Sequence, residues 1–166
     1  MSSKTPLIIG ALAVISAFLY FGANKAKKFI GYLTYELSSF RVHSASLSSI
    51  KCKVAIAVNN PSATAVSIKD YKIEVFLVNS DKSRSLLASS PVNQLAIPEM
   101  QKVTITTDIS ISPLQAAKLV KNLVQTLLKG NVSEVIAALQ SEIKSNTVVV
   151  LKADVLGTFI EKELKW

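Results

Sequence analysis

Residues 103–111 read VTITTDISI and carry the strongest strand signal in the chain. Val103, Ile105 and Ile109 alternate with polar residues such as Thr104 and Asp108. Successive side chains of a strand point to opposite faces of a sheet, so strict alternation predicts a strand with one buried face. A core built from strands of this kind is therefore the first expectation.

The same period-two pattern recurs on both sides of this stretch. The phase slips by one residue at Lys69-Asp70, which predicts a β-bulge or a strand that changes sheets. Residues 79–83 form a predicted hairpin loop, Gly157 a predicted turn, and 95–100 a brief apolar segment with a proline corner. The predicted strands are 33–47, 52–58, 66–77, 86–88, 103–111, 147–156 and 158–166.

Two stretches have helical spacing instead. Ser112, Pro113 and Gln115 form a helix start of the capping-box type, and Gly130 supplies the stop. The stretch 113–129 is thus predicted as one basic amphipathic helix, which could lie on a membrane but is more commonly packed on the open face of a sheet. A second, shorter helix is predicted for 131–144. Apolar residues expected on the buried stripes are Leu114, Ala117, Val120, Leu123, Val124, Leu127 and Leu128 in the first, and Val132, Val135, Ile136, Leu139 and Ile143 in the second.

The N-terminal residues 5–24, TPLIIGALAVISAFLYFGAN, contain no charge. As a helix they would span about 30 Å, the thickness of the hydrocarbon core of a bilayer. A cleaved signal peptide is the rival interpretation, but no good small-x-small cleavage site follows. We expect an uncleaved anchor at 1–25, a juxtamembrane segment at 26–36 and a sandwich domain at 37–166.

Three lysines follow the predicted anchor, Lys25, Lys27 and Lys28, and we expect them at the membrane surface. The positive-inside rule mildly favours a cytoplasmic body, by a margin of about one charge, and leaves the orientation open.

The composition displays no chemistry of catalysis. The 166 residues carry a formal net charge of +8, with a single histidine, His43, and a single cysteine, Cys52. His43 is expected on a polar face and Cys52 as a small buried hydrophobe. There is no glycine-rich phosphate loop, and the carboxylates are dispersed. We therefore expect no enzyme activity, no cofactor, no metal and no nucleic-acid partner.

The runs VAIAVNNPSATAVSIKDYKIEVFLVN (54–79) and LAIPEMQKVTITTDISISPLQAAKLVKNLV (95–124) resemble the late embryogenesis abundant group 2 family, also called the WHy domain. Asn60-Pro61 and Ile97-Pro98 match the turn motifs of the family, and the resemblance covers 37–166, with 131–144 as an apparent insertion. It implies an antiparallel β-sandwich like the immunoglobulin or fibronectin type III domain, with a helix against it. It also implies no enzymatic activity and a role in binding or protecting membranes or proteins.

These observations lead to two functional hypotheses. The first is a non-enzymatic, single-pass membrane protein in a cell or virion membrane, held in the lipid bilayer by 5–24. Its sandwich would link the membrane to a protein partner or layer, or to further copies of itself, and one fitting context is a minor structural protein of a membrane-containing virion. The alternative is a stress-protective or lipid-binding module of the late embryogenesis abundant type.

Overall fold

A computed structural model of the chain describes residues 31–164 and 166. The predicted anchor at 5–24 and the three lysines Lys25, Lys27 and Lys28 lie outside the described residues. Within the described part, no helix is long and apolar enough to cross a bilayer.

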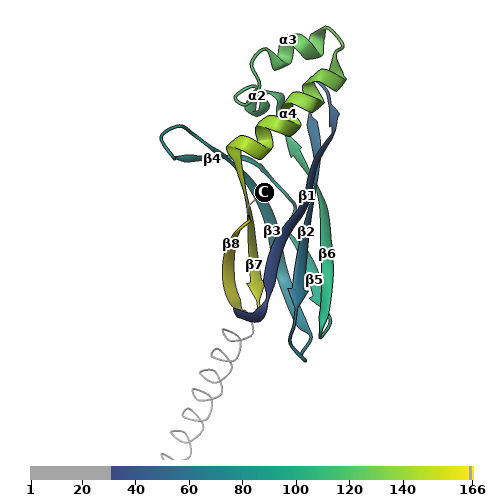
Figure 1. The fold of residues 1–166 in the computed structure, drawn as a ribbon, viewed down its shortest axis with the longest axis vertical. Helices are drawn as coiled ribbons and strands as arrows, with labels where there is room; N and C mark the ends of the chain where they lie inside the picture. Colours follow the sequence, from purple (N-terminus) through teal and green to yellow (C-terminus); the bar gives the residue numbers. More distant parts are fainter. Residues whose placement is uncertain (1–30, 165) are drawn as a thin grey trace, which may run out of the picture.

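The described chain is mainly β, and its strands form two antiparallel sheets (Figure 1). One sheet has the strand order β1-β2-β6. The other has the order β4-β3-β7-β8, with β5 paired to a further part of β3. The strands are β1 Thr34–Ala45, β2 Ile50–Asn60, β3 Val66–Val78, β4 Arg84–Ser89, β5 Asn93–Ile97, β6 Gln101–Ile111, β7 Thr147–Val155 and β8 Thr158–Leu164.

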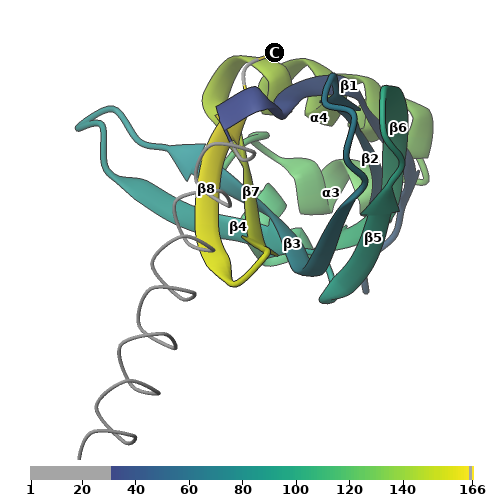
Figure 2. The same cartoon turned by 90° about the horizontal axis from the view of Figure 1, so that it is seen from below.

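The inward-facing residues of the two sheets meet in a single hydrophobic core. Figure 2 shows the sheets on opposite sides of this interior. Ile56 of β2, Ile73 of β3 and Leu151 of β7 are completely buried. Aliphatic side chains dominate because β-branched residues pack well on a pleated surface. The sequence prediction of a mainly β fold is confirmed.

Irregularities in pairing fall where the alternation of the sequence breaks. The pairings of β3 with β5 and with β7 shift register after Ile68, which confirms a bulge at Lys69-Asp70. β1 has register shifts between Leu37 and Ser39 and again near its end. β1 begins at Thr34, so residues 34–36 of the predicted juxtamembrane segment are paired with β2.

The stretch 95–100 contains a strand that the sequence analysis did not predict. Asn93–Ile97 forms β5 and pairs with β3, and only Pro98–Met100 make the turn into β6. The strand is five residues long and is followed directly by a proline, so its alternation is too short to stand out from a loop.

The single helix predicted for 113–129 is wrong. The structure has two short helices, α2 (Pro113–Ala116) and α3 (Leu123–Leu128). Between them Asn122 has a φ of 59°, a left-handed conformation that a helix cannot contain. Three residues of the predicted buried stripe, Leu114, Val124 and Leu128, are exposed. The predicted start is correct, since the Ser112 hydroxyl accepts a hydrogen bond from the Gln115 backbone N–H at 3.2 Å.

The main helix is α4, Val132–Asn146, over the segment predicted as a second, shorter helix. Val135, Leu139 and Ile143 of the predicted stripe are buried in the core, whereas Val132 is exposed. α4 packs mainly against β1 and α3 and closes one end of the space between the sheets (Figure 1). The packing on an open sheet face that was expected of 113–129 is not what the structure shows, because α2 and α3 contact mainly one another and α4.

The molecule thus has two dissimilar ends. We call the first the helix end, made of the turn 46–49 with α2, α3 and α4. The opposite loop end consists of Tyr32 and Leu33, the turns 61–65 and 98–100, and the β7–β8 turn 156–157. Strand pairing places these segments together, because Thr34 pairs with Asn59 and Asn60 with Gln101.

Candidate functional site

The four residues singled out as turn motifs meet at the loop end. Pro61 directly follows β2, Ile97 ends β5 and is completely buried, and Pro98 opens the turn into β6. Asn60 is the last residue of β2 and is also completely buried. Residues far apart in the sequence are thus brought into one cluster.

Asn60 is the centre of this cluster. Its Nδ2 donates hydrogen bonds to the backbone oxygens of Thr64 at 2.8 Å and Pro98 at 3.0 Å. Its Oδ1 accepts from the backbone N–H of Ser62 at 3.1 Å and from the Ser62 hydroxyl at 2.6 Å. The Met100 N–H also donates to the Ser62 oxygen at 2.9 Å. The role of Asn60 is therefore to hold two turns together, since every polar atom of its side chain is satisfied by a neighbouring turn.

A groove of about 880 Å³ runs between β1 and α4. Its lining is mostly apolar, and it is open to solvent. It includes Leu37 and Phe40 of β1, Ile136, Ala137 and Gln140 of α4, and Trp166. A concave, largely apolar surface with a few polar groups is the usual form of a binding site, so this groove is the candidate functional site.

Two aromatic rings give one wall of the groove a fixed shape. The rings of Phe40 and Trp166 meet edge to face, with their centroids 5.3 Å apart. The indole Nε1 of Trp166 donates a hydrogen bond to the backbone oxygen of Thr147 at 2.8 Å. Trp166 is therefore attached to both sheets at the point where α4 passes into β7.

Gln140 fastens α4 to the edge of the first sheet. Its Oε1 accepts from the Val42 backbone N–H at 2.8 Å, and its Nε2 donates to the Phe40 backbone oxygen at 2.6 Å. β1 is an edge strand, so these backbone groups face away from β2 and would otherwise be open to another strand. Gln140 thus blocks strand addition at this point and leaves the apolar groove beside it as the accessible feature.

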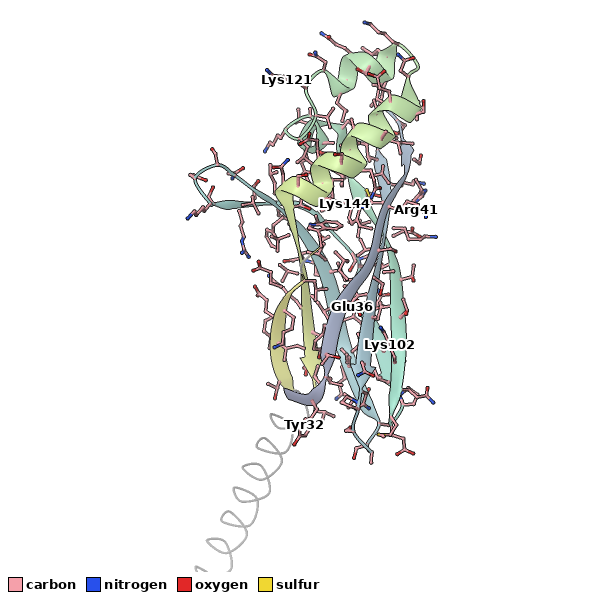
Figure 3. The ribbon with its side chains drawn as sticks, viewed as in Figure 1. Tyr32, Glu36, Arg41, Lys102, Lys121 and Lys144 are labelled. Atoms are coloured by element: carbon pink, nitrogen blue, oxygen red, sulfur yellow. The ribbon has the colours of Figure 1, made fainter. Side chains whose placement is uncertain are left out.

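The rim of the groove is basic. Arg41 from β1 and Lys144 from α4 border it, and no carboxylate side chain is among the described residues that line it. In Figure 3 the two labelled side chains lie on neighbouring elements, β1 and α4, near the same level of the molecule. A ligand that combines an apolar group with a negative charge would complement this arrangement.

The second sheet carries a different polar cluster on its outer face. The carboxylate of Glu74 is largely buried and lies 3.0 Å from Lys72 Nζ and 2.9 Å from Lys152 Nζ. Burial raises the pKa of Glu74, but the hydrogen bonds from Lys152 and Lys72 outweigh it, so that the pKa lies below its ordinary value. Lys152 also approaches Glu161 and the Phe76 ring. We interpret this cluster as a cross-strand ion network rather than a reactive site, because its groups stand on paired positions of neighbouring strands, Lys72 opposite Lys152 and Lys152 opposite Glu161.

Cys52 and His43 occupy the positions expected for them. Cys52 is completely buried in β2, and burial raises the pKa of its thiol to about 12, so the nucleophilic thiolate is not formed at neutral pH. His43 is on the solvent side of β1, with its Nε2 3.6 Å from Asp108 Oδ1. Within 31–164 and 166, no three His, Cys, Asp or Glu side chains are placed to hold a metal ion together.

The sequence does not reveal the groove, although most of the lining residues lie in elements that it predicts. Phe40 and Trp166 fall in the predicted strands 33–47 and 158–166 as ordinary apolar positions, and Gln140 falls in the predicted helix 131–144 as an ordinary polar one. A glutamine near the middle of an amphipathic helix gives no sign that it will bond to an edge strand 100 residues away. The one available signal was the sole tryptophan at the end of the predicted last strand.

No protein-family model matches the chain, and no curated protein matches it significantly. Solved structures give only weak similarities. A protein from Archaeoglobus fulgidus has a TM-score of 0.41 and 11% identity, over 79% of this chain and 98% of that chain. A glycosyl hydrolase family 2 member from Bacteroides cellulosilyticus has a TM-score of 0.40 and 10% identity. The similarity covers 78% of this chain but 15% of that chain.

A late embryogenesis abundant protein is also similar, with a TM-score of 0.29 and 14% identity, over 99% of this chain and 91% of that chain. The resemblance stated from the sequence is therefore unconfirmed. These scores are too low to assign a family. What the fold itself defines is a mainly β protein of two antiparallel sheets with a few short helices.

Proposed function

We propose that this chain is a non-enzymatic, single-pass membrane protein whose body is a β-sandwich of the immunoglobulin or fibronectin type III kind. Its role is structural: it links a membrane to a protein partner or protein layer, with the shell of a membrane-containing virion as one such layer. The uncharged run 5–24 supports the membrane attachment.

The observation that carries the proposal is the apolar groove with its basic rim. Phe40, Ile136 and Trp166 offer a recess for an apolar side chain, and Arg41 and Lys144 offer charge to an acidic surface around that side chain. Neither basic side chain forms an ion pair with another described residue. A buried apolar anchor within a charged rim is the usual anatomy of a protein interface. The partner we propose is therefore an acidic protein surface with an exposed apolar residue.

The test is a native purification from membranes, followed by mass spectrometry of the proteins and lipids that accompany the chain. The proposal predicts a stoichiometric protein partner. That partner should be lost from a variant with Arg41→Glu and Lys144→Glu. It should be retained by a variant with Lys118→Glu and Lys121→Glu, which makes the same change of four charge units at residues that do not line the groove; Figure 3 shows Lys121 away from it. If all variants retain the same proteins, the groove is not the contact and the proposal is wrong.

An acyl chain is the second candidate occupant, and the same groove favours it because a fatty acid also joins an apolar tail to a negative charge. This is the stress-protective or lipid-binding alternative. It predicts lipid without a stoichiometric protein in the purification, and loss of that lipid when Trp166→Ala or Ile136→Asp alters the groove. Protein and lipid recovery in one experiment thus separates the two proposals.

A further inference from the structure

Four exposed apolar side chains gather at the loop end. Tyr32, Met100, Leu156 and Phe159 are 48%, 70%, 46% and 68% exposed. Val155 pairs with Thr158, so Leu156 is at the tip of the β7–β8 hairpin and Phe159 is beside it. Figure 3 places the labelled Tyr32 at this end, and β1, which begins two residues later, contacts β8.

Two of these side chains stand at backbone positions that do not suit them. Met100 and Leu156 both have a φ of 53°, in the left-handed region. Gly, Asn and Asp are the residues that tolerate this conformation, and turns use them for that reason. Here each turn instead carries a large apolar side chain that points away from the core. Neither side chain belongs to the hydrophobic core or packs against it, so core packing does not account for this choice.

The path of the chain identifies what this end would meet. The predicted membrane span ends at Asn24, and only residues 25–30 separate it from the described fold, which begins at Gly31 of the loop end. Six residues reach about 20 Å at full extension. If the span is in a bilayer, as the proposed function requires, the loop end is therefore held close to the lipid surface.

We propose that the loop end contacts the bilayer directly and inserts Met100, Leu156 and Phe159 into the boundary between head groups and acyl chains. Tyr32 lies at the same boundary, where aromatic side chains with a polar tip are favoured. Asn60 keeps the turn that carries Met100 in place, through its bond to Pro98. The sandwich then stands on the membrane with its helix end and groove turned toward the partner. This inference rests on the proposed function, because without the anchor nothing holds the loop end at a membrane.

The experiment uses the full chain in lipid nanodiscs that contain a shallow spin-labelled lipid as a fluorescence quencher. A bimane probe is attached to Met100→Cys or Phe159→Cys in separate samples. The matched control is Leu128→Cys at the helix end, because Leu128 is apolar and 67% exposed. The native Cys52 is completely buried and should remain unlabelled. The inference predicts about three times more quenching at 100 and 159 than at 128.

A second set of variants separates insertion from simple proximity. Met100→Asn and Leu156→Asn, made singly and together, suit the left-handed backbone and remove the apolar groups. The thermal midpoint should stay constant or rise, while quenching of a probe at 159 falls about twofold in the double variant because the apolar contact is weakened. A structural role for Met100 and Leu156 would instead lower the midpoint, and that result would overturn the inference.

The outcomes also distinguish the inference from the proposed function. If the chain stays in the nanodisc but the probes at 100, 159 and 128 are quenched equally, the bilayer contact is wrong and the membrane attachment stands. If the chain does not remain with the nanodisc, both fail.

Discussion

The two ends of the molecule are closed in opposite ways. At the loop end, Asn60 joins the turns 61–65 and 98–100 through hydrogen bonds to backbone groups. At the helix end, Leu139 and Ile143 of α4 and Leu123 of α3 close the core by apolar packing. Hydrogen bonds are directional and fix one geometry, whereas apolar packing tolerates several arrangements of similar volume. The geometry of the loop end therefore depends on the Asn60 side chain. Closure of the helix end depends on several apolar side chains that could be exchanged for others of similar volume.

The same contrast separates what each end offers to a partner. The loop end displays separate apolar side chains on turns of defined geometry. The helix end borders a groove that runs along β1 and α4 and ends at Trp166. We associate the first with the membrane and the second with the proposed protein partner.

The largest effect should come from removing packing at the helix end. Leu139 is completely buried, so Leu139→Ala is expected to lower the free energy of unfolding by about 3–4 kcal/mol through lost transfer energy and a residual cavity. Chemical denaturation of the detergent-solubilised chain measures this. Leu128→Ala in α3 is the control and should change the free energy by less than about 0.5 kcal/mol, because Leu128 is exposed. An equal decrease in the free energy of unfolding in the two variants would mean that Leu128 is buried, as the predicted continuous helix over 113–129 requires.

The next effect should come from the hydrogen-bond cluster at the loop end. Asn60→Ala would leave the Pro98 oxygen and the Ser62 N–H without their partner, at a cost of about 2–3 kcal/mol. The Thr64 oxygen would lose one donor and keep the Ser62 hydroxyl. Asn79→Ala serves as the control, since Asn79 makes one exposed side-chain bond to Ser83 in the β3–β4 loop. We expect Asn79→Ala to lower the free energy of unfolding by less than about 1 kcal/mol. Similar losses at both asparagines would mean that the cluster is not what closes this end.

A smaller effect, informative by its sign, is expected at Asn122. In a continuous helix Asn122→Ala would be stabilising, because alanine has the higher helix propensity. In the observed left-handed conformation it should be destabilising by about 1 kcal/mol, because alanine tolerates positive φ less well than asparagine. Asn122→Gly should be neutral or stabilising. A stabilised Ala variant in thermal unfolding would contradict the break between α2 and α3.

The sequence predicted the loop end better than the helix end for a physical reason. Asn60-Pro61 and Ile97-Pro98 are local signals, since asparagine and proline determine their own turns whatever surrounds them. The alternation in 103–111 is equally local and predicted β6 correctly. The stretch 113–129 has helical spacing, yet the chain breaks at Asn122 and forms two short helices. Tertiary packing decided that segment, and propensity is a weak guide where packing decides.

The candidate site could be predicted only in part, since it depends on contacts between distant elements. Phe40 and Trp166 were recognisable as apolar positions. Their edge-to-face contact joins β1 to the end of the chain, and no pattern of spacing encodes it. The bond from Gln140 to Phe40 likewise needs the docked position of α4.

The smallest change in the free energy of unfolding should come from acid. It protonates Glu74, which lies in the middle of the second sheet and at neither end. Glu74 is the only buried carboxylate among the described residues, and it pairs across strands in the middle of the second sheet. Burial raises the pKa of Glu74, but the hydrogen bonds from Lys152 and Lys72 lower it by more. The pKa therefore lies below its ordinary value of 4.5. A group whose pKa is lower in the folded state adds stability above its unfolded pKa. That contribution is therefore complete above about pH 5 and is lost as the pH falls through 4.5 toward the lower folded value.

Glu74→Gln should remove this acid dependence from the free energy of unfolding, while Glu163→Gln, which changes an exposed pair with Arg84 on the same face, should retain it. Denaturation curves at several pH values between about 3 and 7 make the comparison. Because Glu74 touches neither end, acid should lower the stability of the Leu139→Ala and Asn60→Ala variants by the same increment. If acid lowered the free energy of unfolding more in one of these variants than in the other, the ion network around Glu74 would be coupled to the end that the variant changes. The two ends would then not contribute to stability independently.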